Sequence, residues 1–118
     1  MRVMITGSRD WTDQRMIQAS LVTINATMRK NDEPMTLVHG GAKGADTIGA
    51  AAATELGWTL EEHIPDWSKG KRAGPLRNVE MLESGVDCVV AFHKDGSRGT
   101  RHAIETARKM KIPVKVHT

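Results

Sequence analysis

With 118 residues, of which 39% are hydrophobic and 26% charged, the chain has the size and composition of one globular domain, residues 1–118, without room for a separate substrate domain. The net charge of +3 is only mildly basic, and aromatic residues make up 3% of the chain. With so few aromatic residues, the stacking platforms typical of single-stranded nucleic-acid binding are mostly missing. No apolar stretch is long enough to span a membrane, so no membrane partner is predicted.

Short apolar runs alternate with helical patterns along the chain. Strands are predicted over residues 2–6, 35–39, 58–64, 86–92 and 112–116. Helices are predicted between them, over residues 13–30, 45–56, 74–85 and 99–110. Thr12 or Asp13 is expected to cap the first helix. The alternation predicts the α/β class: a single Rossmann-like domain with an open parallel β-sheet of about five strands and helices on both faces.

Strand composition predicts the order within this sheet. The first strand is expected at the centre, whereas the weaker apolar run at 58–64 and the proline-containing run at 112–116 are expected at the edges. Cys88 lies in the apolar run 86–92 and is interpreted as a buried small hydrophobe rather than a nucleophile. A lone cysteine forms no disulfide within the chain, and no signal peptide precedes the first strand, so a reducing, cytoplasmic location is predicted.

Three glycine-containing loops each follow a predicted strand. They are Gly7-Ser8-Arg9, Gly40–Asp46 and Gly96–Thr100. The carboxyl ends of parallel strands meet at one edge of a sheet, so these loops are expected to converge on one crevice. Glycine loops and helix N-termini both present backbone N–H groups to anions. The sequence therefore predicts a pocket for a phosphate-bearing ligand.

The loop Gly40–Asp46 fits neither the Walker A pattern nor the dinucleotide fingerprint, because Lys43 precedes Gly44 and the glycine spacing differs. Its glycines are expected to leave several N–H groups for an anion, and Lys43 supplies a positive charge. A second interpretation is a tight turn that needs glycine for its geometry alone. Asp46 either complements the helix dipole or contacts a ligand hydroxyl.

The other two loops also allow two interpretations each. Arg9 forms either a bidentate pair with phosphate or a surface salt bridge. Ser97 and Thr100 bind phosphate, cap the following helix, or do both. Asp66-Trp67 forms a wall or lid of the pocket, or Trp67 simply covers the core. A basic cluster follows within nine residues and is either a phosphate-binding surface or a solvated loop: Lys69, Lys71, Arg72 and Arg77.

Three histidines lie at predicted strand ends: His39, His63 and His93. They lie on separate strands with neither a metal-binding motif nor a partner cysteine, so no metal site is predicted. His39 and His93 are instead expected to donate hydrogen bonds into the pocket.

Motifs spread over nearly the whole chain together resemble one family. They are Thr6–Trp11, His39–Asp46, Asp66-Trp67, Gly74–Asn78 with Met81-Leu82, and Ser97–Thr100. In this order they resemble the YspA-type, cpYpsA-related branch of the SLOG superfamily. The resemblance implies a Rossmann-like fold that binds a nucleotide or nucleotide-derived ligand of the ADP-ribose, NAD or nucleoside-phosphate type. A role as sensor or carrier follows, with no other cofactor required.

The candidate binding residues combine the glycine loops with charged and amide side chains. They are Gly7, Ser8, Arg9, Gly40, Gly41, Ala42, Lys43, Gly44, Asp46, Asp66, Arg77, Asn78, Ser97, Arg98, Gly99 and Thr100. Phosphate is expected at the glycines and hydroxyls, with Arg9, Lys43 and Arg77 neutralising its charge. Asp46, Asp66 and Asn78 are expected to meet ribose or base.

Two other functions are compatible with the sequence. The superfamily includes the LOG phosphoribohydrolases, whose Pro-Gly-Gly-x-Gly-Thr-x-x-Glu motif ends in a catalytic glutamate. Ala103 stands at that position here, so hydrolysis needs a relocated acid, and the candidate catalytic residues are Arg77, Glu80 and Asp46. The superfamily also includes DprA, which makes single-stranded DNA binding the other alternative. The alanine-rich helix over 45–56 and the dimers common among relatives predict a homo-oligomer.

Overall fold

The computed structural model describes residues 1–94 and 96–118. Over these residues the strands are β1 (Arg2–Gly7), β2 (Thr36–His39), β3 (Thr59–Glu62), β4 (Cys88–Phe92) and β5 (Val114–His117). The helices are α1 (Gln14–Thr27), α2 (Ala45–Glu55), the 3-10 helix η1 (Trp67–Arg72), α3 (Ala73–Glu83) and α4 (Arg98–Lys109). All the strands pair in parallel in the order β3-β2-β1-β4-β5, which confirms the predicted fold class, the central first strand and both edges.

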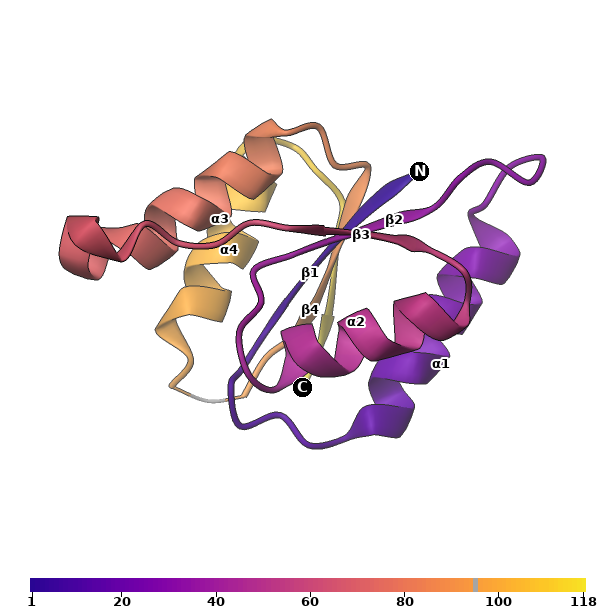
Figure 1. Cartoon of the computed structure of the whole chain (residues 1–118), viewed down its shortest axis with the longest axis horizontal. Helices are drawn as coiled ribbons and strands as arrows, with labels where there is room; N and C mark the ends of the chain where they lie inside the picture. The colour runs from indigo at the N-terminus through magenta and orange to yellow at the C-terminus, as the bar shows by residue number, and fades with distance from the viewer. Residues whose placement is uncertain (95) are drawn as a thin grey trace.

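The helices cover the two faces of the sheet in pairs, α1 with α2 on one face and α3 with α4 on the other (Figure 1). Side chains of β1 alternate between these layers. Val3 and Ile5 belong to the core beneath α1 and α2, and Met4 belongs to the core beneath α3 and α4. The small residues of α2 allow it to lie close to β1, because a Cβ atom on Gly49 would collide with the Ile5 side chain.

Several element boundaries differ from the predicted ones. β5 starts at Val114 because Ile112 still donates its N–H to Ala107 at the end of α4, and Pro113 has no N–H to donate. β3 ends at Glu62 and not at residue 64, as suits an edge strand with one neighbour. The predicted loop 65–73 contains η1, whose first turn is capped by the Asp66 carboxylate accepting from Ser68 N–H.

Two other expectations about single residues hold. Asp13 caps α1 by accepting from the N–H of Met16. Cys88 is buried, and loss of solvation raises the pKa of its thiol to about 11, which keeps it protonated near neutral pH. None of the helices among the described residues is both long enough and apolar enough to cross a membrane.

Candidate functional site

The carboxyl ends of the strands surround a crevice made of two chambers that share a wall. The first chamber has a volume of about 460 Å³ and lies between the end of β1, the start of α3 and the start of α4. The second has a volume of about 450 Å³ and lies between the loop Gly40–Lys43, the end of β3 and η1. Both chambers are lined by Arg9, Ala42, Trp67 and Arg77, so one ligand can extend from one chamber into the other.

The first turn of α4 opens into the first chamber. Its backbone N–H groups, those of Arg98, Gly99 and Thr100, have no hydrogen-bond acceptor among residues 1–94 and 96–118. The side chain of Ser97, the N-cap residue, does not bond to the helix backbone; its hydroxyl lies 2.7 Å from the Thr100 hydroxyl. The first turn of α4 and the positive end of its helix dipole therefore lie at the cavity together.

Two arginines flank the boundary between the chambers. Arg77, on α3, is partly buried and donates from Nη1 to the carbonyl of Gly40 at 2.9 Å. Burial lowers the pKa of Arg77, the Asp46 carboxylate opposes this, and the positive charge of Arg9 lowers it further. Arg9 is exposed, and its guanidinium has no ion pair within the described part of the chain. Two neighbouring cations thus lie close enough to repel each other, and an anion between them would relieve that repulsion.

The loop Gly40–Asp46 uses its N–H groups differently from the prediction. Gly40 and Ala42 donate to one Asp46 oxygen, at 3.0 and 3.5 Å, and Gly41 donates to Nδ1 of His39 at 3.1 Å. The expectation that these three groups turn toward an anion is therefore wrong. Burial raises the pKa of Asp46, while the N–H donors and Arg77 oppose that shift. Asp46 thus holds the loop in shape by accepting hydrogen bonds from the loop's own backbone.

Backbone contact between two loops fixes the position of Arg9. Gly44 has φ +80°, and a Cβ atom there would collide with the carbonyl oxygens of Ser8 and Arg9. Ser8 is buried, and its hydroxyl accepts from the N–H of Lys94 at 2.8 Å. The loops after β1, β2 and β4 are thereby joined beneath the crevice.

Most of the predicted binding residues come together at this crevice. The first chamber is lined by Gly7, Ser8, Arg9, Ala42, Asp46, Arg77, Asn78, Ser97, Arg98, Gly99 and Thr100. The second is lined by Arg9, Gly40, Gly41, Ala42, Lys43 and Arg77. Gly44 lines neither, because it packs against the loop after β1, and Asp66 lies beside a smaller hollow of about 70 Å³.

The sequence prediction missed part of the second chamber, which is lined by Glu62, Ile64 and Pro65. Of the two interpretations of Trp67, the structure agrees with the pocket wall, because this side chain lines both chambers and is largely exposed rather than covering the core. Glu62 ends β3, so the rule that ligand-binding loops follow parallel strands points to its position, although not to the cavity that it shares with Trp67.

The carboxylates considered for catalysis are engaged in internal hydrogen bonds. Asp46 accepts from its own loop, and Glu80 lies 3.0 Å from Nδ1 of His63. Ala103 is fully buried in the core between α4 and the sheet. His39 was expected to donate into the pocket, but its Nδ1 atom accepts a hydrogen bond from the N–H of Gly41. Neither His39 nor His93 lines the two chambers. No cluster of potential metal ligands occurs among the residues that the structure describes.

Comparison with known proteins assigns the family. The model of the family described as "YspA, cpYpsA-related SLOG family" matches residues 1–70. The chain belongs to this SLOG family. Gene 61 protein of Mycobacterium phage D29 is 41% identical over 119 residues, covering 96% of this chain and 93% of that protein.

The SLOG fold also relates the chain to a solved structure. DNA processing protein A (DprA) from Streptococcus pneumoniae superposes with a TM-score of 0.77 at 20% identity over 98% of this chain. The SLOG chain spans 49% of that DprA chain. At this identity the likeness shows the fold alone.

An ion-pair network fastens α3, which carries Arg77, to the edge of the SLOG sheet. Nη1 and Nη2 of Arg2 each donate to Glu61 at 2.7 Å, and Nε2 of His63 lies 2.7 Å from the same carboxylate. Nδ1 of His63 faces Glu80 on α3. The hydrogen bonds from Arg2 and then His63 lower the pKa of Glu61 to about 2. Burial by itself lowers the pKa of His63, but Glu61 and Glu80 outweigh it and raise that pKa.

We expect His63→Gln to cost the SLOG chain about 0.5–1 kcal/mol of unfolding free energy below pH 6, and little above pH 8. Because the pKa of His63 is raised on folding, its contribution is full below the unfolded pKa of about 6.5 and disappears as pH rises through the folded value. Urea titrations of both proteins at pH 5.5 and 8.5 measure this. A difference that grows with pH contradicts the network.

Proposed function

We propose that this SLOG chain binds a nucleotide or nucleotide derivative, with the phosphate in the first chamber. The observation that carries the proposal is the meeting of Arg9 and Arg77 with the open first turn of α4 in one cavity. Arginine forms bidentate hydrogen bonds with phosphate oxygens, and a helix N-terminus supplies further N–H donors. The nucleotide-related function of the family and its DprA-like fold support the same ligand class.

The crevice is larger than a free phosphate ion requires, and it contains further polar side chains. A cavity of about 460 Å³ is within the size range of small-molecule sites. The amide of Asn78 lies at its floor, donating to the carbonyl of Gly99 at 3.3 Å. Asp10 also lines this cavity, and its carboxylate lies 4.0 Å from Nζ of Lys94. Polar groups for a sugar therefore accompany the cationic groups for a phosphate.

The hydrogen bonds that engage the candidate catalytic carboxylates favour binding of the ligand without its hydrolysis. Burial raises the pKa of Asp46, which accepts hydrogen bonds from its own loop, and Glu80 pairs with His63. Asp46 lines the first chamber, but its carboxylate holds the loop after β2, and Glu80 and the buried Ala103 do not line that chamber. A sensor or carrier role follows from retention of the intact ligand.

Calorimetric titration with nucleoside 5′-monophosphates and with the parent nucleosides tests the proposal. We expect micromolar to submillimolar binding of the monophosphates, and at least about tenfold weaker binding of the nucleosides, since charged hydrogen bonds contribute about 1.5–3 kcal/mol each. Equal affinities would mean that the phosphate is not recognised. Release of free base during the titration would favour the phosphoribohydrolase alternative.

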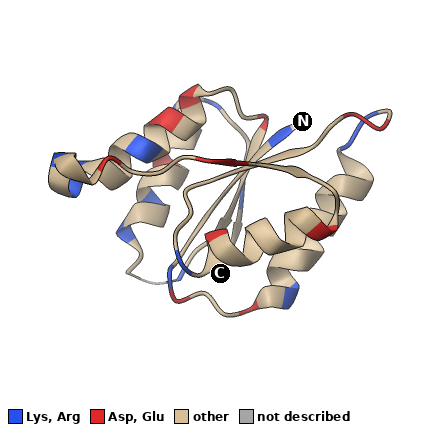
Figure 2. Ribbon diagram, in the orientation of Figure 1, with Lys and Arg blue, Asp and Glu red and all other residues tan. Residues whose placement is uncertain are grey.

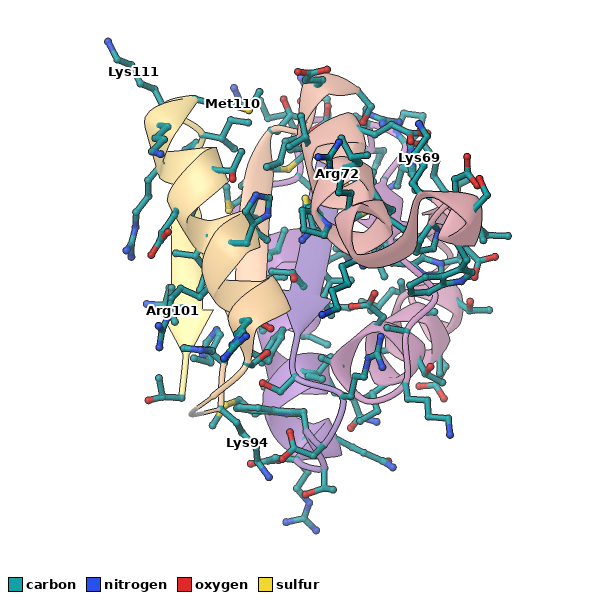
Figure 3. All side chains as sticks on the ribbon, turned by 90° about the vertical axis from the view of Figure 1, so that its left-hand side faces the viewer. Lys69, Arg72, Lys94, Arg101, Met110 and Lys111 are labelled. Carbon is teal, nitrogen blue, oxygen red and sulfur yellow. The ribbon has the colours of Figure 1, made fainter. Side chains whose placement is uncertain are left out.

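Single-stranded DNA binding is the second candidate, favoured by the basic segment η1. Figure 2 shows Lys and Arg at the tip of this segment, which carries Lys69, Lys71 and Arg72. Figure 3 shows Lys69 and Arg72 near each other at this segment, with Arg101 at the opposite edge of the view, beyond α4. For DNA, the affinity of an oligonucleotide would exceed that of a mononucleotide and would fall steeply with salt. Similar affinities for both ligands would dismiss this candidate.

A further inference from the structure

One wall of the second chamber is an aromatic side chain, Trp67, that is largely exposed to solvent. The Trp67 side chain is 63% exposed, and its indole has neither a hydrogen bond nor an aromatic partner among the described residues. Trp11 and Trp58, in contrast, are buried, and their indole N–H groups donate to Asp13 and Asn25. An exposed indole beside a cavity offers a flat surface for stacking a ring.

Other apolar side chains extend this wall. Ile64 is 71% exposed, and it lines the second chamber together with Pro65. Trp67 and Ile64 are the two most exposed of the large hydrophobic residues that the structure describes. Their gathering at one chamber marks a surface that is covered when a ligand binds.

A carboxylate without a partner faces the same chamber. Glu62 has neither a hydrogen bond nor an ion pair within residues 1–94 and 96–118, whereas Glu61 and Glu80 are both paired. Its Oε1 atom lies over Gly41, where φ is +70° and a Cβ atom would collide with it. Glycine therefore leaves the space that the carboxylate occupies. An ionised carboxylate only accepts hydrogen bonds, so this position repels phosphate and favours N–H or O–H donors.

The start of α4 in one chamber, and the carboxylate with the apolar wall in the other, give a ligand one orientation. The cationic side chains of Arg9 and Arg77 lie at the boundary of the chambers, and the first turn of α4 lies in the first chamber. Glu62, Lys43 and the apolar wall lie in the second, which has no α-helix N-terminus among its described lining residues. A phosphate near the arginines therefore directs the remainder of a nucleotide toward Trp67.

Building on the proposed function, we infer that the second chamber is a base subsite, in which Trp67 stacks on the base and Glu62 accepts hydrogen bonds from two adjacent N–H donors. Guanine presents such a pair, at N1 and the exocyclic N2. Adenine presents a single donor group beside a ring acceptor, which an ionised carboxylate repels. The chain is therefore selective for guanine nucleotides.

Titration with GMP, IMP and AMP tests this inference. We expect GMP to bind about tenfold or more tightly than AMP, since a bidentate base contact discriminates by about that factor or more, and IMP, which lacks the N2 group, to lie between them. Glu62→Gln should weaken GMP and strengthen AMP, because the amide offers one donor and one acceptor, which match N1 and N6 of adenine. Trp67→Ala should weaken all three ligands by about tenfold, and Trp67→Phe should retain most of the binding. Glu83→Gln, which removes the same charge from an exposed position on α3, serves as the control.

The outcomes separate this inference from the proposed function. If GMP and AMP bind equally and Glu62→Gln changes neither, the base subsite is wrong although phosphate binding stands. If dGMP binds more weakly than GMP and Glu62→Gln removes that difference, the carboxylate contacts the sugar, which overturns the base assignment. If no nucleotide binds the wild-type chain, the proposed function itself is wrong.

Discussion

Gly44→Ala is expected to destabilise the chain by about 3 kcal/mol or more, the largest single effect on stability that we predict. The residue has φ +80° and ψ −125°, a conformation that essentially only glycine adopts. A Cβ atom would also collide with the backbone carbonyls of Ser8 and Arg9, and backbone moves less readily than a side chain. Relief of this collision requires the loops after β1 and β2 to separate. Urea-induced unfolding measures the loss.

Gly57→Ala is the matched control for that prediction. Gly57 also has φ +80°, but nothing lies within 4 Å of a Cβ atom added there. Only the backbone conformation is then strained, for about 1 kcal/mol. Similar losses in the two variants would contradict the close contact between the loops.

Arg9→Ala is expected to weaken the binding of a nucleoside monophosphate by about 10–100-fold, because charge-assisted hydrogen bonds contribute about 1.5–3 kcal/mol. Arg9 is exposed and has no ion pair among the described residues, so the stability of the fold should change by less than about 0.5 kcal/mol. Arg77 is less suitable for this test because it also holds the carbonyl of Gly40. Calorimetry measures the affinity, and thermal unfolding verifies the fold.

Two further variants show whether the effect of Arg9 is local. Arg9→Lys keeps the charge but loses the planar fork, so an intermediate affinity is expected. Arg108→Ala removes the same charge from the last turn of α4, at the opposite end of that helix from the crevice. If Arg108→Ala weakens binding as much as Arg9→Ala, the effect is that of net charge, and the position assigned to the phosphate is wrong.

The sheet was predictable because its pattern is local in the sequence. Apolar runs separated by helical periods specify parallel strands, and parallel strands bring their carboxyl ends together. This is why Arg9, Arg77 and Gly99, which are far apart along the chain, were expected in one crevice. The boundaries of β5 and η1 were less predictable, because they depend on hydrogen bonds by Ile112 and Asp66 that no periodicity reveals.

The sequence did not determine which hydrogen-bond partner each polar group has. Glycine spacing predicted open N–H groups in the loop after β2, but buried Asp46 and neighbouring His39 accept them. The second chamber depends on Glu62 and Trp67, two exposed side chains from an edge strand and an irregular segment, where burial patterns carry little information. Only the three-dimensional structure shows that they share a cavity.

The most direct test of the central claim is to follow the backbone amides of ¹⁵N-labelled chain by NMR during titration with a nucleoside monophosphate. We predict that the amides of Arg98, Gly99 and Thr100 shift most, that the amide of Arg9 follows them, and that inorganic phosphate shifts the same group. Saturated binding that leaves the first turn of α4 unchanged would contradict the claim that this crevice holds the phosphate.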